Sequence, residues 1–93
     1  MSIIIIGGDR LGKIPLLLKE HGFHLLEHVP GRKKGDIKTG IPREAEGVVI
    51  FTDFLNHNLA LEIKAAAKRQ GKKVVFAQRS WSKLSKALLD LKA

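Results

Sequence analysis

Apolar runs and amphipathic stretches alternate along the 93-residue chain. The first run, Ile3 to Ile6, is continuous and β-branched and ends at two glycines, which predicts a strand buried on both faces of a sheet. From Leu11 to His21 the large apolar residues fall on one stripe at helical spacing, and Gly22 follows as a stop signal. Phe23 to Val29 is apolar enough for a second strand. The beginning of the chain therefore predicts a strand–helix–strand unit.

The second half of the chain repeats this alternation. Gly47 to Phe51 and Val74 to Ala77 are short apolar runs, which predict a third and a fourth strand. A helix is expected after each of these strands, because residues with capping side chains precede stretches of helical periodicity. The first of these helices is capped by Asn56 or Asn58 and ends near Gln70, with Gly71 after it; the second is capped by Ser80 or Ser82 and carries Leu84, Leu88 and Leu91.

The order of these elements predicts the fold. Residues 30–45 lack periodicity and are rich in Gly, Pro and charge, so we expect a long loop, with room for a short turn within 33–44. Strands that alternate with helices form a parallel sheet with right-handed crossovers. We therefore predict one domain over residues 1–93: a small three-layer α/β domain of the Rossmann or flavodoxin-like type, with a four-stranded parallel sheet in the order 2-1-3-4.

Composition narrows the possible functions. The chain contains no cysteine, which excludes disulfides, a thiolate metal site and a cysteine nucleophile. Its start has no basic segment and no long apolar stretch, so we expect neither a signal peptide nor a membrane span, and a cytoplasmic location. A domain of this size buries a smaller share of its surface than a larger domain and is only marginally stable alone, so we expect a homodimer.

The charge of the chain is the strongest indication of its ligand class. Seventeen Lys and Arg residues against nine Asp and Glu give a net charge of +8. Such an excess attracts polyanions, although it also serves plain solubility. Nine of the basic residues follow or adjoin the predicted carboxyl ends of strands, where open parallel sheets bind their ligands. A second basic cluster, at residues 68–73, precedes the fourth strand and favours a polymer that wraps around the domain.

The turn after the first strand is a candidate phosphate site. Glycines let a ligand approach the backbone, and a helix amino terminus offers unpaired N–H groups to an anion. The glycine spacing differs from the dinucleotide fingerprint, and the Gly-Lys-Ser/Thr of a P-loop is missing. An ordinary strand-to-helix turn also favours such residues. The candidate phosphate-binding residues are Gly7, Gly8, Asp9, Arg10 and Lys13.

A basic loop and the residues after the fourth strand are candidates for nucleic-acid contacts. Lysines and arginines of the loop 30–44 would bind phosphates without reading sequence. The only tryptophan could stack on an unpaired base, although such residues more often pack on a core or in a dimer interface. The candidate nucleic-acid-binding residues are Arg32, Lys33, Lys34, Lys38, Arg43, Arg79 and Trp81.

Polar residues near the ends of the second and third strands suggest a pocket, formed by His28, Thr52, Asp53 and His57. Together with Asp9 they could bind a divalent metal or act as an acid–base pair, but Thr52 or Asp53 could equally cap a helix. The aspartate after the third strand also invites comparison with phosphoacceptor receiver domains. Those domains need an acidic pair after the first strand and five strands, which this chain lacks.

Taken together, these motifs resemble a bacterial family known as domain of unknown function twenty-three twenty-five, over nearly the whole chain. The resemblance rests on Ile5-Ile6-Gly7-Gly8 with Arg10 soon after, His28 followed by Gly31, Thr52-Asp53 with His57, and Gly71-Lys72 before the last strand. The chain departs from the family at Asn56, where the family has a serine, which weakens any role for a hydroxyl at this position. The resemblance implies that Arg10, His28, Thr52, Asp53 and His57 belong to one site.

Our leading interpretation is a nucleic-acid-binding module without catalysis, which uses the basic carboxyl edge of the sheet and the loop 30–44, with RNA or DNA as its partner and no cofactor or metal. The alternative is a sensor of a small phosphorylated ligand or nucleotide at the Gly7–Arg10 turn. An enzyme of phosphate-ester chemistry and a purely structural dimer module are further hypotheses.

Overall fold

The computed structural model describes residues 1–8, 10–29, 41–53 and 57–92. Its four strands form one parallel sheet in the order β2-β1-β3-β4, as predicted. The inner strands are β1 (Ser2–Ile6) and β3 (Gly47–Phe51), and the outer strands are β2 (His24–Val29) and β4 (Lys73–Ala77). The inner strands are the continuous apolar runs of the sequence, because their side chains are covered on both faces.

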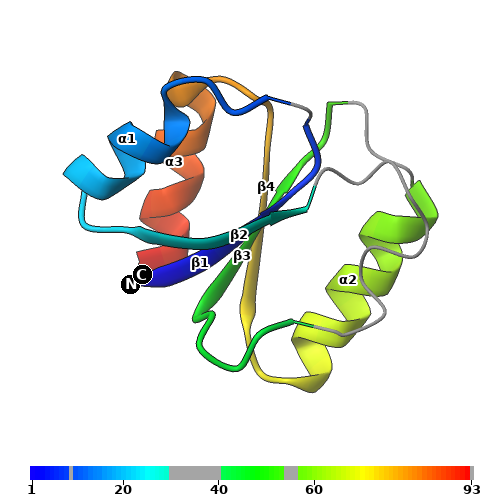
Figure 1. The fold of residues 1–93 in the computed structure, drawn as a ribbon. Helices are drawn as coiled ribbons and strands as arrows, with labels where there is room; N and C mark the ends of the chain where they lie inside the picture. Colours follow the sequence, from blue (N-terminus) through cyan, green and yellow to red (C-terminus); the bar gives the residue numbers. More distant parts are fainter. Residues whose placement is uncertain (9, 30–40, 54–56, 93) are drawn as a thin grey trace.

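Three helices cover the two faces of this sheet. Figure 1 shows α1 (Ile14–Glu20) and α3 (Trp81–Lys92) on one face and α2 (His57–Arg69) on the other. The fold is therefore the three-layer, Rossmann-like α/β arrangement that the sequence predicts. None of these helices is long and apolar enough to cross a membrane in the part of the chain that the structure describes.

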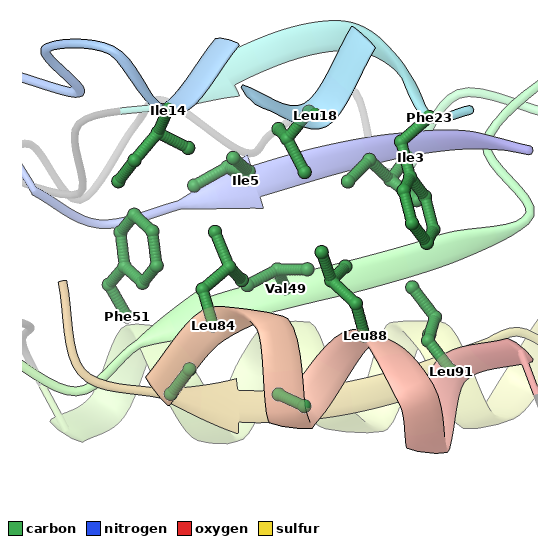
Figure 2. Close-up of a cluster of buried hydrophobic side chains, with 12 residues drawn as sticks. Ile3, Ile5, Ile14, Leu18, Phe23, Val49, Phe51, Leu84, Leu88 and Leu91 are labelled. Carbon is green, nitrogen blue, oxygen red and sulfur yellow. The ribbon is translucent and has the colours of Figure 1, made fainter. Parts of the chain in front are cut away.

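Each face of the sheet has its own hydrophobic core. On the α1–α3 face, Leu18 and Leu84 are fully buried against Ile5 and Val49, and Figure 2 shows these side chains meeting between the two helices and the strands. On the α2 face, Ile63 is buried with side chains from the inner strands and from the segment before β3. Alternate residues of β1 thus serve alternate cores, which fixes the register of the sheet.

Glycine ends two of the helices in the same way. At the end of α1, Gly22 has a φ of 83°, and the N–H of Phe23 donates to the carbonyl of Leu18 at 2.9 Å. Gly71, with a φ of 69°, follows α2 in the same pattern. This is the Schellman arrangement, which needs a left-handed residue that glycine supplies without strain. The predicted stops at both glycines are confirmed.

The start of α1 differs from the prediction. The apolar stripe begins at Leu11, but the helix begins only at Ile14, whose N–H donates to the carbonyl of Leu11. Gly12 adopts a φ of 56°, which turns the backbone out of a helical path. Of the residues predicted to cap the other two helices, Ser80 immediately precedes α3, whereas Asn58 lies inside α2. The alternative cap Asn56 and most of the predicted loop lie outside the described residues.

Candidate anion-binding site

The turn after β1 lies at the carboxyl edge of the sheet and has a left-handed backbone. Gly7 and Gly8 have φ values of 97° and 77°, which other residues adopt only with strain. The N–H of Gly7 donates to the carbonyl of Val29 at the end of β2, at 2.7 Å. The first two strands therefore continue their pairing into the turn.

The ring of His28 holds this turn from β2. Its Nε2 lies 2.9 Å from the carbonyl oxygen of Gly7 and 3.0 Å from that of Gly8. Carbonyl oxygens only accept hydrogen bonds, so Nε2 carries the proton and donates to both. His28 thus positions the turn, and its Nε2 is occupied by that task.

Gly8 also permits a close approach of its neighbours. A Cβ atom at this position would lie 3.3 Å from Cδ2 of Phe51 and 3.5 Å from Cδ of Arg79. The turn is therefore packed directly against the end of β3 and against the connection between β4 and α3. Glycine fits here both because of its φ and because a larger residue would crowd Phe51.

Arg79 connects three loops at this edge. Its backbone N–H donates to Oδ2 of Asp53, after β3, at 3.3 Å. Its guanidinium Nη1 donates to the backbone carbonyl of Arg10, after β1, at 2.5 Å. A guanidinium has five N–H donors in a planar fork, so this hydrogen bond leaves others for a ligand.

A hollow opens beside this connection. It encloses about 340 Å³. Arg10 and Arg79 border it, and α3 begins there at Trp81. A phosphate in this position would lie beside Arg10, Arg79 and the positive end of a 12-residue helix. We call it the arginine hollow; its lining residues are Arg10, Leu11, Gly12, Ile14, Arg79, Ser80 and Trp81.

Trp81 forms one wall of the hollow but is not a freely exposed ring. It is half-buried and packs on the core between α1 and α3. On its other side the ring of His21 lies 4.9 Å away, centroid to centroid, at a tilt of 54°. The tryptophan therefore stands between the hollow and the end of α1, and its structural role accounts for most of its contacts.

The other predicted residues lie in several places. Lys13 is exposed near the hollow, and Thr52 lies at the same edge, where its hydroxyl donates to the carbonyl of Ala77 at 3.4 Å. Arg43 lies elsewhere: its carbonyl accepts a hydrogen bond from Nζ of Lys72 at 3.0 Å, at the amino edge of β3 and β4. The structure does not bring Arg43 together with Arg10 and Arg79. Asp9, Arg32, Lys33, Lys34, Lys38 and the side chain of His57 lie outside the described part.

Within the described residues, no cluster of three or more His, Asp or Glu side chains could hold a metal ion. His28 and Asp53 of the predicted pocket both contact backbone groups, of the Gly7–Gly8 turn and of Arg79 respectively. They act there as positioning residues.

Four residues that line the hollow are not among the predicted site residues: Leu11, Gly12, Ile14 and Ser80. The sequence holds a signal for two of them. Gly12 interrupts an apolar stripe at the start of a helix, and Ser80 stands where a helix amino terminus follows a strand. The two hydrogen bonds of Arg79 could not be predicted from the local sequence, because both partner residues are distant from it in the chain.

A family model described as "Uncharacterized protein conserved in bacteria (DUF2325)" matches residues 2–91. This range includes every strand and almost all of the last helix. No curated protein and no solved structure matches the chain.

Proposed function

The chain belongs to this uncharacterized bacterial family, and we propose that it is a nucleic-acid-binding module that holds phosphate groups at the carboxyl edge of its sheet, without catalysis. The observation that carries the proposal is the arginine hollow, where Arg79 is fixed to the backbone of Arg10 beside the start of α3. Preorganised guanidiniums bind phosphate with charge-assisted hydrogen bonds and lose little side-chain entropy when they do so.

The distribution of charge supports a polymer as the ligand. The net charge of +8 far exceeds what one phosphate group requires. Exposed cations lie not only beside the hollow but also along α2, at Lys64, Lys68 and Arg69. A nucleic acid that contacts several of these groups gains affinity from the release of its counterions. The proposal places this activity in the cytoplasm, where such polymers are abundant.

The proposal is tested by fluorescence anisotropy with labelled single-stranded and duplex oligonucleotides over a series of salt concentrations. We expect binding whose affinity falls steeply as the salt concentration rises. Arg10→Ala is expected to weaken binding about fivefold to tenfold and to reduce the salt slope by about 1, the loss of one phosphate contact. The absence of binding even at low salt would exclude the proposal.

Lys19→Ala is the charge-matched control. Lys19 is exposed in the last turn of α1, away from the residues of the hollow, and its loss changes the net charge by the same amount. If the hollow is the site, Arg10→Ala weakens binding clearly more than Lys19→Ala does. Equal effects of the two variants would mean that only the total charge matters. The triple variant of Arg32, Lys33 and Lys34 to alanine tests the loop, and its effect is expected to be independent of nucleotide sequence.

A small phosphorylated ligand is the second candidate, because the hollow has a bounded volume of about 340 Å³ and mixed polar and apolar walls. Trp81 is the only tryptophan of the chain and borders the hollow, so its fluorescence reports an occupant directly. A nucleotide that changes this fluorescence and raises the melting temperature, with no response to oligonucleotides, would favour the sensor. The loop triple variant should then bind almost normally, whereas Arg10→Ala should not.

A further inference from the structure

The outer side of β4 is an open sheet edge. Within the described residues β4 pairs with β3 alone, so one side of it presents unpaired backbone groups. The register shows which groups these are. The carbonyl of Ala77 accepts from the N–H of Thr52 on the β3 side, at 2.9 Å. Because backbone groups alternate in direction along a strand, Val74 and Phe76 direct their N–H and carbonyl groups away from β3.

These two residues are placed symmetrically about Val75, the middle of β4. The side chain of Val75 packs toward the α1–α3 core, whereas Val74 lies on the α2 face. Phe76 is 46% exposed, which is unusual for a phenylalanine in a strand. An open edge strand with an exposed aromatic residue is suited to pair with another strand.

A groove runs along this edge beneath the flank of α3. It encloses about 850 Å³ and is lined by β4 together with Lys83, Lys86, Ala87 and Asp90. These positions recur at helical spacing, so they form one side of α3, next to its buried stripe. The helix returns along β4 in the opposite direction (Figure 1), so Lys83 lies near the carboxyl end of the strand and Asp90 near its amino end.

We infer that this edge is where a second copy of the chain binds, with the two β4 strands antiparallel about a twofold axis at Val75. Val74 of each copy then lies opposite Phe76 of the other, and the outward backbone groups form four hydrogen bonds. The exposed Phe76 gains a β-branched neighbour across the strands. The result is a continuous eight-stranded sheet.

The place of Asp90 on α3, at the opposite end of this side from Lys83, favours a second copy over an acidic foreign strand. The twofold axis reverses the order of charges on the facing helix, so Lys83 of each copy approaches Asp90 of the other. An acidic peptide would match the lysines but would be repelled by Asp90. The two copies would direct their carboxyl edges in opposite directions, so this interface does not depend on the phosphate site.

A cysteine cross-link tests the register, because the chain has no cysteine of its own. In the inferred dimer the two Val75 residues form a non-hydrogen-bonded pair, with Cα atoms about 4.5 Å apart, within the range that a disulfide spans. Val75→Cys is therefore expected to form covalent dimers on mild oxidation. Lys73→Cys is the matched control on the same strand and face; its two copies would lie about 13 Å apart, since each residue of a strand adds about 3.3 Å, and should not cross-link.

Sedimentation of the unmodified protein and a charge exchange give a second readout. Lys83→Asp or Asp90→Lys alone should raise the dissociation constant of the dimer about tenfold, because each change breaks two ion pairs and creates like-charge contacts. The double variant should return the dissociation constant to within about threefold of that of the unmodified protein. Circular dichroism confirms that each variant is folded.

A protein that stays monomeric at millimolar concentration, with Val75→Cys not cross-linked, overturns the inference. Equal cross-linking of Lys73→Cys and Val75→Cys overturns the register and with it the twofold pairing. If an extended acidic peptide binds to the monomer and protects β4, the groove belongs to such a peptide and not to a second copy.

Discussion

The guanidinium of Arg79 donates a hydrogen bond to the backbone carbonyl of Arg10, a residue 69 positions earlier in the chain. This contact joins the loop after the last strand to the turn after the first strand, across the carboxyl edge of the sheet. It also holds the guanidinium of Arg79 beside the backbone of Arg10, and both residues border the arginine hollow. Arg79 therefore links the loops that form the candidate site.

Arg79→Lys retains the charge but removes the planar fork of donors. A lysine ammonium is a compact point charge, so it cannot reproduce the contact with Arg10 and still present further donors in a plane. We expect oligonucleotide affinity to fall about threefold to tenfold, with the salt slope nearly unchanged because the number of cations is the same. Anisotropy titrations at three salt concentrations measure both quantities. An affinity equal to that of the unmodified protein would show that only the charge at this position matters.

His28→Ala is expected to loosen the turn that carries Arg10. The change removes the donor to the carbonyls of Gly7 and Gly8, which are buried, and should lower the free energy of unfolding by about 1–2 kcal/mol. His24→Ala is the matched control, because His24 lies on the same strand with its side chain exposed. Urea denaturation compares the two variants. Equal stabilities would mean that the ring of His28 does not hold the turn.

Much of the fold could be predicted because its signals are local. Each strand is a short apolar run, and Gly22 and Gly71 mark helix ends whose geometry requires a left-handed residue. The start of α1 was placed too early because the side chain of Leu11 fits the helical stripe, and periodicity alone does not register the left-handed backbone of Gly12.

The site could be predicted only in part, because its contacts are not local. The rule that ligands gather at the carboxyl ends of parallel strands correctly brought Arg10 and Arg79 to one edge. It did not apply to Arg43, which comes shortly before β3 and so lies at the amino end of that strand. The packing of Trp81 on His21 depends on where α1 ends relative to α3, which no local pattern encodes.

Two glycine substitutions separate backbone strain from crowding. Gly8 and Gly12 both have positive φ values, of 77° and 56°, so alanine at either position should cost about 1–2 kcal/mol. A Cβ atom at Gly12 meets nothing within 4 Å, whereas one at Gly8 crowds Phe51. Gly8→Ala should therefore be the more destabilising change, by about 1 kcal/mol, since overpacking adds to the strain. Chemical denaturation of both variants provides the measurement, and a larger loss for Gly12→Ala would contradict the packing described at the turn.

Lys72 is a basic residue whose main role is structural, although it belongs to the positive cluster before β4. Its Nζ donates to the carbonyls of Ala45 and Arg43, so it fastens the segment before β3 to the end of α2. Lys72→Met should lower the free energy of unfolding by about 1–2 kcal/mol through the loss of these bonds. Lys68→Met removes the same charge from an exposed position on α2 and should leave stability almost unchanged.

The same two variants test whether Lys72 contacts nucleic acid. The ammonium of Lys72 is already hydrogen-bonded to backbone carbonyls, so Lys72→Met should reduce oligonucleotide affinity by a small factor, no larger than the factor for Lys68→Met. A markedly greater loss of binding for Lys72→Met, at temperatures where the variant is fully folded, would mean that the amino edge of the sheet takes part in the nucleic-acid interface.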